Sequence, residues 1–594
     1  MAQQGGRRRS AGNGEGGPAR RASGRGRPPA DHHEVEWQFD AEDLDAAETW
    51  LRRHSSETGL VVEPEPEEKI TDTYYDADNW RFYRAGYALR VRKVKGGAEA
   101  TMKSLSPAEG EVRRRREITE PLKDDKPGAL GKAPGPVGER ARSLLGEREP
   151  RAMFEVRTRR RKFALLLENP AGGKEDGDQD NEVRIGEVVL DSSEVPLDGG
   201  RESARLSRVE VEAGSGTALT PDLRGFVDEM RGALGLKPAT LSKFETGLYA
   251  AGLSPDGDTD VGPVGIGPSM TLGGVAFAVL RRQFAEMRAH EPGTRLGEDP
   301  EELHDMRVAT RRMRAAMKVF EGALPERAKW LREELRWLAG MLGDVRDLDV
   351  QIEGLEAWRD GDVVGDGLGS SLGKIFGVLE KRRAERRGSM LEALDGERYG
   401  RLEESFGEML RRGPGAEREL GRAGGHPAED GPVTAAAPAL ISARYRKWRK
   451  RAKGLDESSP PDDFHDVRKK GKKLRYALEF VSEVYGEPVA DLVSPLKKVQ
   501  DSLGDHQDAV VAAETLRELG ITTKVPRIPR AAAFAMGVLC ERHEREAADK
   551  RAEVLRSKPL RALVKGKVWK EFEGVMEDAA KAASEREVFE EMAH

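Results

Sequence analysis

The sequence predicts an α+β protein in which a β-rich half precedes an all-helical half. From Glu34 to about Leu248, polar and apolar residues mostly alternate, as in strands that bury one face. After a segment rich in Gly, Pro and Asp at 251–267, the apolar period becomes helical. A repeat within the helical half indicates a duplicated helical unit.

The composition allows substantial cores beneath a very polar surface. Of the 594 residues, 37% are hydrophobic and 35% are charged, and the formal net charge is −6. This length predicts two or more domains. Nucleic-acid-binding domains are usually net basic, so anion binding here must come from local clusters of Lys and Arg, and nucleic acid is the least favoured partner.

Cysteine usage and hydropathy bound the setting of the protein. Cys540 is the single cysteine, which excludes an intrachain disulfide and a thiolate zinc site and fits a reducing cytoplasm. The sequence has no run of about 18 apolar residues, so no membrane span is expected. Residues 1–30 carry seven arginines among Gly, Pro and Ser, which predicts a disordered basic tail.

The first half places charged residues on one face of several predicted strands. Residues two apart in a strand share a face, so Glu34 lies beside Glu36 and opposite Trp37. The same spacing relates three further pairs: Glu210 and Glu212, Arg90 and Arg92, and Thr101 and Lys103. If the apolar faces pack outward against helices, the charged faces point inward. The expected sheet is then a closed barrel with a polar lumen.

A lumen that holds both carboxylate pairs and cations suits phosphate chemistry. Carboxylates at this spacing suit a hard divalent ion, Mg²⁺ or Mn²⁺, which usually bridges to substrate phosphate. Facing Arg and Lys side chains bind the remaining phosphate oxygens. These features predict metal-assisted attack of water on a terminal phosphate. The alternative is a half-solvated sheet with its charges in water, because one Glu-X-Glu pair is a weak indication.

An ordered set of motifs runs through residues 31–250: Glu34-Val-Glu36, Asp72-Thr-Tyr-Tyr-Asp76, Arg84-Ala-Gly-Tyr-Ala-Leu-Arg-Val-Arg92, Arg208-Val-Glu-Val-Glu212 and Ser242-Lys243. Together they resemble the CYTH family, the triphosphate tunnel metalloenzymes. The resemblance implies an eight-stranded antiparallel tunnel with flanking helices, which hydrolyses short inorganic triphosphate with Mg²⁺ or Mn²⁺. The implied metal site consists of Glu34, Glu36, Glu210, Glu212 and Asp191. The implied triphosphate-binding residues are Arg90, Arg92, Lys103, Arg115, Arg159 and Lys243.

One position departs from the family pattern. The opening motif of the family has a lysine where this chain has Gln38, and Gln38 and Lys103 are the positions assigned to catalysis. Glutamine keeps a hydrogen-bonding group but lacks the positive charge, and a preorganised donor beside the attacked phosphate contributes about 2–4 kcal/mol. The replacement by Gln38 is consistent with an activity that is lowered, redirected to another substrate or lost. Because both carboxylate pairs remain, a working phosphohydrolase is favoured.

Two motifs recur in the helical half at one offset. His304-Asp-Met-Arg307 resembles His465-Asp-Val-Arg468, and Leu342-Gly-Asp344 resembles Leu503-Gly-Asp505. The separations agree, because 465 − 304 = 161 and 503 − 342 = 161. Two matches at the same offset indicate that a helical unit was duplicated.

Each of these histidine helices carries a stripe of cations. Positions three and four apart share a helical face. This spacing aligns two sets of residues: His304, Arg307, Arg311 and Arg314, and His465, Arg468, Lys472 and Arg475. Like charges this dense cost stability unless an anion neutralises them. The alternatives are salt bridges to nearby aspartates, structural histidines, and a His–Asp metal site, which the excess of cations disfavours.

These repeats, within residues 268–560, resemble the CHAD domain, an α-helical domain. The resemblance implies a paired four-helix arrangement that binds inorganic polyphosphate in a basic groove lined by the two sets of residues above. CYTH followed by CHAD is also a known order. The basic segment Ser442–Lys453 is expected to extend the positive surface.

Three functions are consistent with these patterns. The first is a metal-dependent triphosphatase, held near its substrate by a polyphosphate-binding domain in the cytoplasm or at polyphosphate granules. The second is a non-catalytic polyphosphate-binding protein with a degenerate tunnel. The third is a nucleoside or thiamine triphosphatase, or an adenylate cyclase, on the same fold. The expected partners are inorganic triphosphate and long-chain polyphosphate. The expected segments are a tail (1–30), the tunnel (31–250), a linker (251–267), the helical domain (268–560) and a C-terminal helical extension (561–594).

Overall fold

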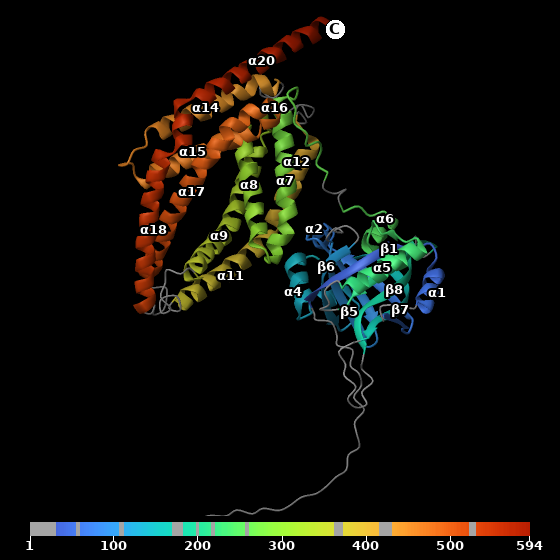
Figure 1. Ribbon diagram of the computed structural model, residues 1–594. Coiled ribbons are helices and arrows are strands. Elements are labelled where there is room, and N and C mark those ends of the chain that lie inside the picture. The colour runs from blue at the N-terminus through green and yellow to red at the C-terminus, as the bar shows by residue number, and fades with distance from the viewer. Residues whose placement is uncertain are drawn as a thin grey trace, which may run out of the picture.

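The computed structural model describes residues 31–54, 60–105, 112–168, 182–197, 201–214, 220–255, 260–360, 372–414, 431–521 and 530–593. The predicted basic tail at 1–30 lies outside these residues. A β-rich domain comes first and a helical domain follows, as Figure 1 shows. The α+β fold class predicted from the sequence is confirmed.

Eight antiparallel strands of the described residues close into a barrel. Their order is β1-β6-β5-β4-β3-β7-β8-β9, and β9 pairs back onto β1. The strands are β1 (Asp31–Asp40), β3 (Glu68–Asp76), β4 (Tyr87–Val94), β5 (Gly97–Ser104), β6 (Val112–Leu122), β7 (Arg151–Glu168), β8 (Glu182–Leu197) and β9 (Glu202–Ala213). Two short strands extend the sheet: β2 (Leu60–Pro64) on β7, and β10 (Lys237–Pro238) on β1. The closed sheet has no exposed long edge in this part.

The alternation of β1 determines which side chains face the lumen. Trp37 and Phe39 lie on the outer face and are buried against α1 and α5. Glu34, Glu36 and Gln38 therefore point inward, because side chains alternate along a strand. The helices of this domain are α1 (Leu44–Arg53), α2 (Arg81–Arg84), α3 (Pro127–Leu130), α4 (Pro136–Leu145), α5 (Pro221–Leu234) and α6 (Lys243–Ala250).

The start of α6 is fixed by a capping box. The Ser242 hydroxyl accepts a hydrogen bond from the Glu245 amide, and the Glu245 carboxylate accepts one from the Ser242 amide. This reciprocal pair satisfies two backbone donors at the helix start. Lys243 thus becomes the first residue of α6, at a defined place beside the barrel.

The described helices of the second half pack around one large apolar core. They are α7 (Leu272–Leu296), α8 (Pro300–Val319), a 3₁₀ turn (Glu321–Ala323), α9 (Ala328–Asp360), α11 (Gly373–Asp395), α12 (Glu397–Arg412), α14 (Val433–Lys453), α15 (Pro461–Glu479), α16 (Ser482–Tyr485), α17 (Glu487–Ile521), α18 (Arg530–Arg556), α19 (Lys558–Lys565) and α20 (Lys567–Ala593). Parts of α9, α11, α17 and α18 form a second, smaller core. None of the described helices is long and apolar enough to span a membrane.

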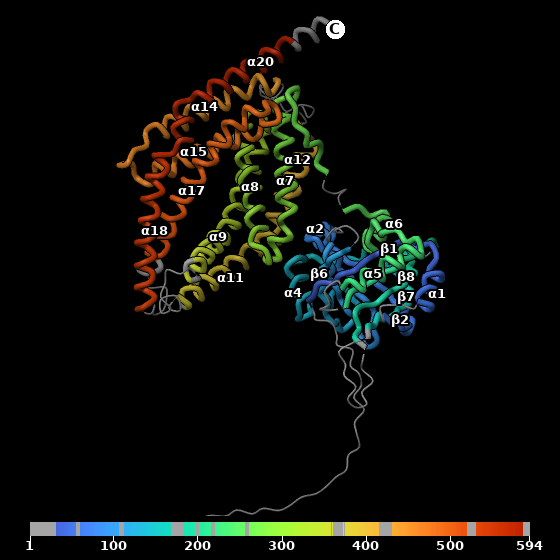
Figure 2. Tube along the Cα trace, viewed as in Figure 1, coloured from blue at the N-terminus to red at the C-terminus, as the bar shows by residue number. Residues whose placement is uncertain are grey.

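The duplication is visible in the helical domain. The pair α8 and α9 of the first repeat corresponds to the pair α15 and α17 of the second (Figure 2). The repeats meet where α8 packs against α15, and the rings of Phe320 and Phe480 lie 6.0 Å apart at the ends of these helices. The two cationic stripes therefore lie on neighbouring helices.

Residues of the predicted C-terminal extension pack into the helical core. Trp569, Phe572 and Met576 of α20 are buried in the same cluster as α14. The Trp569 ring stacks on Tyr445 with centroids 3.9 Å apart. The apolar face of α20 thus supports the basic helix α14 from behind.

A buried network of ion pairs joins the two domains. Glu291 of α7 is 1% exposed and accepts hydrogen bonds from Arg84 of α2 (3.1 Å) and Arg295 (2.8 Å). Arg295 also donates to Asp395 at the end of α11 (2.6 Å), and Arg81 of α2 lies 3.6 Å from the same carboxylate. Burial would raise the pKa of Glu291, but the surrounding arginines lower it to about 2. The glutamate therefore stays charged between the domains.

Candidate functional site

Three carboxylates from neighbouring strands converge in the barrel. Glu34 and Glu36 come from β1 and Glu212 from β9, and one oxygen of each lies within 4.8 Å of the others. Glu36 pairs directly with Glu212 in the strand register. Glu36 is 1% exposed, and its Oε1 atom makes no hydrogen bond. A buried carboxylate oxygen without a hydrogen bond is costly, so this donor set fits a hard divalent cation.

The protonation of these carboxylates reflects their crowding. Burial raises the pKa of Glu34 and of Glu36 to about 7, although Lys103 acts against the rise. Burial and the neighbouring Glu36 raise the pKa of Glu212 to about 7. Three carboxylates that resist losing protons together are typical of a site completed by a cation.

Cations line the lumen beside the carboxylates. Lys103 of β5 contacts Glu34 and lies 3.4 Å from Glu117 of β6. The Nη1 atom of Arg115 lies 3.6 Å from Glu36 Oε1. Arg115, which the family resemblance implies as a triphosphate-binding residue, therefore lies in the lumen. Burial would lower the pKa of Lys103, but Glu34 and Glu36 raise it, so the ammonium group stays charged.

Arg90 and Arg92 enter the lumen from β4 and share one partner. Arg92 makes a two-point contact with Asp72 of β3, at 2.7 and 2.9 Å, and Arg90 lies 3.5 Å from the same carboxylate. Burial would raise the pKa of Asp72, but Arg90 and Arg92 lower it to about 2. Asp72 thus holds both guanidinium groups in place, and the other terminal nitrogen of Arg90 lies 4.0 Å from Glu117.

A second group of charges lies where α6 meets the barrel. Lys243 contacts Asp191 of β8 and lies 3.0 Å from Glu210 of β9. Gln38 Nε2 donates to Glu210 Oε1 at 3.1 Å. Glu210 and Asp191, which the sequence predicted as metal ligands, are thus engaged by polar and cationic groups outside the three-carboxylate cluster. Gln38 and Lys243 contact the two oxygens of the same Glu210 carboxylate, so a positive charge lies on the other side of that carboxylate from Gln38.

The prediction that Arg159 faces the lumen is wrong, and its neighbour Arg160 takes that place. Arg159 is 66% exposed on the outer face and pairs with Glu67. Arg160 is 12% exposed, donates to Asp191 at 2.6 and 2.8 Å, and lies 3.5 Å from Glu210. The register explains the difference, because Arg160 pairs with Asp191 across β7 and β8. The pairing of Arg160 with Asp191 would have indicated which arginine faces the lumen, but sequence reasoning missed it. Sequence reasoning also missed Asp72, which positions Arg90 and Arg92.

The two cationic stripes of the helical domain meet between α8 and α15. Arg311 Nε donates to the hydroxyl of Tyr476 at 3.1 Å, which links the repeats. Lys472 lies near Arg311, Arg468 and Arg475. Burial lowers its pKa, and these three arginines lower it further, to about 8. Three arginines thus crowd Lys472, and Asp508 is the acidic group that acts against this shift.

Other cations near this face are already paired. Arg312 makes an ion pair with Glu479 across the repeats (2.8 Å), and Arg475 lies 3.4 Å from the other oxygen of Glu479. Arg307 lies 3.7 Å from Asp347. Arg314 is half-buried, and burial together with Arg336 lowers its pKa. The acidic groups thus neutralise part of the positive charge and leave the region around Lys472 in excess.

The two histidines occupy equivalent places at the starts of the stripes. His304 and His465 both lie partly buried, one turn before Arg307 and Arg468. Burial lowers the pKa of His465, and Lys469 and Arg468 act in the same direction, which keeps the ring neutral. Among the residues that the structure describes, neither histidine belongs to a group that could hold a metal.

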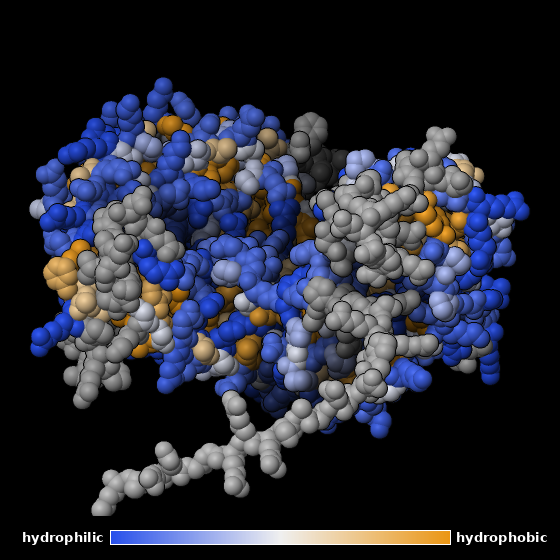
Figure 3. Space-filling view, turned by 60° about the horizontal axis from the view of Figure 1, so that its bottom comes forward, coloured by the Kyte–Doolittle hydropathy of each residue, from blue (hydrophilic) through white to orange (hydrophobic). Residues whose placement is uncertain are grey.

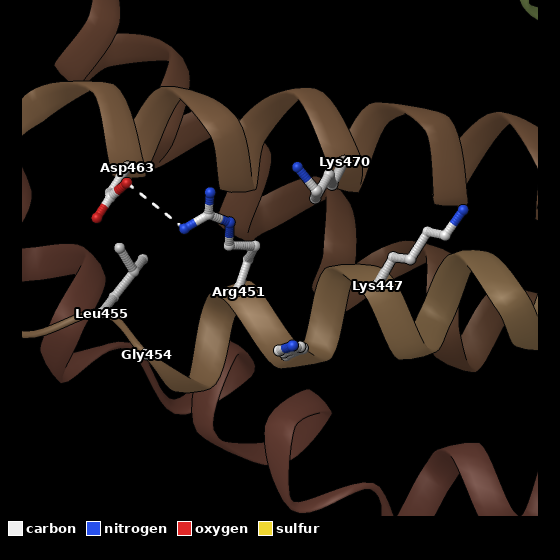
Figure 4. Close-up of a pocket in the computed structure, with 7 residues that line it drawn as sticks. Lys447, Arg451, Gly454, Leu455, Asp463 and Lys470 are labelled. Atoms are coloured by element: carbon white, nitrogen blue, oxygen red, sulfur yellow. Dashed lines mark ion pairs between the residues drawn. The ribbon is translucent and has the colours of Figure 1, made fainter.

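A second basic pocket lies between α14 and α15. It has a volume of about 470 Å³ and is lined by Lys447, Lys450, Arg451, Gly454, Leu455, Asp463 and Lys470. Figure 4 shows Arg451 turned toward Asp463, at 3.8 Å, while Lys447 lies away from that pair. Lys470 contacts Asp466, which also binds Arg451 at 2.9 Å. The predicted basic segment Ser442–Lys453 thus contributes one wall of a pocket with an excess of cations.

One face of the molecule is strongly polar. Figure 3 shows hydrophilic side chains over most of the face in view, with apolar side chains in scattered patches. Such a surface agrees with the high content of charged residues and favours ionic over apolar contacts with a ligand.

Comparison with known proteins matches each half separately. A CYTH domain matches residues 33–230, and a CHAD domain matches residues 278–517. An uncharacterized protein of Mycobacterium tuberculosis (strain CDC 1551 / Oshkosh) is 31% identical over 230 residues, which cover 37% of this chain and 40% of that protein. The chain thus spans about two fifths of the length of the curated relatives it matches.

Two solved structures are similar to parts of the chain. The CHAD domain of the plant Ricinus communis is 26% identical and covers 51% of this chain and 95% of its own, with a TM-score of 0.42. A putative adenylyl cyclase from Hippeastrum, described as having a dominant triphosphatase activity, is 13% identical. It covers 38% of this chain and 99% of its own, with a TM-score of 0.25.

Proposed function

Because the chain carries a CYTH domain followed by a CHAD domain, we propose that its barrel hydrolyses short inorganic triphosphate and that its helical domain binds long-chain polyphosphate. The observation that carries the hydrolase is the cluster of Glu34, Glu36 and Glu212 inside a barrel lined by cations. Carboxylates alone would repel a phosphate chain, so the pairing of both charges in one lumen favours a metal–phosphate complex.

The carboxylates and the cations of the lumen have distinct roles in this proposal. Glu34, Glu36 and Glu212 would hold Mg²⁺ or Mn²⁺, which neutralises phosphate charge and lowers the pKa of a bound water. Arg90, which Asp72 holds in the lumen, and Lys103, which stays charged, bind the oxygens of the phosphate chain. The Asp72 contact fixes the neighbouring Arg92.

The position of Gln38 is compatible with activity in this arrangement. Gln38 orients Glu210 through its amide, and Lys243 contacts the other oxygen of the same carboxylate. Lys243 and Arg160 supply positive charge on the side where the family has a lysine. We expect a lowered rather than a lost rate, because the missing charge is replaced from α6 and β7 and not from β1.

A substrate panel tests this function. The full chain is incubated with tripolyphosphate, ATP, thiamine triphosphate or long-chain polyphosphate, with Mg²⁺ or Mn²⁺, and phosphate release is measured. Tripolyphosphate is expected to be the best substrate. Preference for ATP or thiamine triphosphate would favour a nucleotide-directed or thiamine-directed enzyme. If no phosphate is released from any of the four substrates, the hydrolase proposal fails, and the alternative of a binding protein with a degenerate tunnel is favoured.

The metal assignment has its own control. The double variant Glu34→Gln with Glu36→Gln is expected to lose phosphate release and divalent-metal binding measured by calorimetry. Glu202→Gln, at an exposed glutamate at the start of β9, should leave both unchanged. Full activity in the double variant would show that Glu34 and Glu36 do not hold the metal.

The observation that carries polyphosphate binding is the crowding of Lys472 by Arg311, Arg468 and Arg475. A polyanion would neutralise this excess, and such binding weakens as salt rises. The pocket beside Lys447 and Lys450 offers a second contact for a long chain. Binding should be lost in Arg307→Glu with Arg468→Glu and kept in Arg545→Glu, which reverses an exposed charge on α18. Unchanged binding in the double variant would place the ligand elsewhere.

A further inference from the structure

The two motifs of each helical repeat meet in space, with a glycine beneath an arginine. Gly504 of α17 lies under Arg468, where an added Cβ atom would be 3.2 Å from Nη2 of the arginine. Gly343 of α9 lies under Arg307, where an added Cβ atom would be 3.5 Å from Nε. Both pairs obey the repeat, because 504 − 343 = 161 and 468 − 307 = 161.

An aspartate accompanies each of these pairs at the same offset. Asp347 lies 3.7 Å from Arg307, one turn after Gly343. Its equivalent is Asp508, since 508 − 347 = 161. Burial raises the pKa of Asp508, and Arg468 and Lys472 act against that rise, which places its carboxylate within reach of their charge. Each arginine therefore has a helix backbone below it and a carboxylate beside it.

Backbone conformation does not explain these two glycines. Both lie inside long helices, and neither has a positive φ angle. Glycine is less favourable than alanine inside a helix. Gly340, in the same helix as Gly343, has no atom within 4 Å of an added Cβ and so marks what an unconstrained helical glycine looks like. At Gly504 an added methyl group would crowd the guanidinium group of Arg468, and at Gly343 it would come into van der Waals contact with Arg307.

We infer that Gly343 and Gly504 are positioning residues that seat Arg307 and Arg468 for binding phosphate oxygens. The inference rests on the proposed polyphosphate binding. A long arginine side chain loses much conformational freedom when it binds an anion. Seating it against a helix removes part of that loss before binding, and the planar guanidinium is then presented in a fixed orientation. The Leu-Gly-Asp segments thus serve the His-X-X-Arg helices.

The test compares single alanine variants of the full chain. Gly504→Ala should weaken binding of long-chain polyphosphate about threefold, because its contact is the tighter one, and Gly343→Ala should weaken it less. Gly340→Ala is the matched control and should bind like the parent protein. All three should unfold at the parent temperature or above, because alanine is the better helix former. Equal affinity in Gly504→Ala and the parent, or equal loss in Gly340→Ala, would overturn the inference.

A second readout does not depend on polyphosphate. Arginines are modified with phenylglyoxal, and the rate at Arg468 is followed by mass spectrometry. Gly504→Ala should raise this rate by lifting the guanidinium from the helix, and Gly340→Ala should not. If the parent protein binds no polyphosphate, the proposed function fails, and the modification rate still decides whether the glycine seats the arginine. An unchanged modification rate at Arg468 in Gly504→Ala would contradict the inference that Gly504 positions this arginine.

Discussion

Replacing Lys472 by methionine should stabilise the protein and weaken its hold on polyphosphate at the same time. Lys472 is partly buried, and Arg468, Arg311 and Arg475 surround it. Methionine keeps the length of the side chain and its packing but removes the repelled charge. A gain in stability with a loss in binding is the expected mark of a residue retained for an anion.

The expected gain in the free energy of unfolding follows from the shift in the pKa of Lys472. The pKa falls from the ordinary value of 10.5 to about 8. At about 1.4 kcal/mol per pH unit, the full difference is about 3 kcal/mol. Solvent screens the repulsion because the side chain is only partly buried, so we expect about 1–2 kcal/mol.

The sign of the pH dependence is opposite to that of an ion pair. The pKa of Lys472 is lower in the folded chain, so between pH 8 and 10.5 the unfolded chain binds more protons. The repulsion is fully present below pH 8 and is relieved as pH rises through that window. The advantage of Lys472→Met should therefore be greatest at pH 7 and small at pH 10.

Urea unfolding followed by tryptophan fluorescence measures this effect at both pH values. Lys473→Met is the matched control, because Lys473 is exposed on the same helix and should change stability by less than about 0.5 kcal/mol. Polyphosphate affinity at two salt concentrations completes the assay. A lowered urea midpoint for Lys472→Met at pH 7 would refute the reasoning, since it would mean that the ammonium group is stabilised in the fold.

Three further outcomes are expected. Arg160→Met should lower kcat/KM for tripolyphosphate about a hundredfold, while Arg159→Met should leave it within about twofold, because only the former side chain faces the lumen. Gln38→Lys should raise phosphate release about tenfold by restoring a charge beside Glu210, and a fall in rate would show that the amide contact matters more. Glu291→Ala should lower the free energy of unfolding by about 3–5 kcal/mol in urea titrations, because it removes the buried carboxylate that both Arg84 and Arg295 contact, whereas Glu286→Ala on the exposed side of α7 should have little effect.

The residues of β1 that face the lumen could be predicted, because polar and apolar residues alternate from Glu34 to Phe39. Glu34 and Glu36 alternate with Val35 and Trp37, so one face is charged and the other is apolar. The segment 157–162 offers no such contrast, because it carries five cations and one threonine, and both of its faces are polar. The phase of β7 therefore depends on its pairing with Asp191 of β8, which a local pattern cannot supply.

In the helical domain, the sequence predicted both motifs of the repeat but not their contact. The constant offset shows that a unit was duplicated, without showing which helices of a unit are neighbours. Gly504 and Arg468 are 36 residues apart, and only the packing of α15 against α17 brings them together. The role of Glu479 was missed for the same reason, since its partner Arg312 belongs to the other repeat.

The network at the domain interface has a consequence for how the chain is made. Asp395 follows Arg81 by 395 − 81 = 314 residues. At about 5–20 residues per second, it leaves the ribosome roughly 15–60 seconds after Arg81. In the folded protein Arg81 also donates to the carbonyl groups of Leu144 and Leu145, at 2.8 Å each, and both of these partners belong to the barrel domain. The barrel can therefore fold first. Its arginines then bind the later helices as these dock during translation.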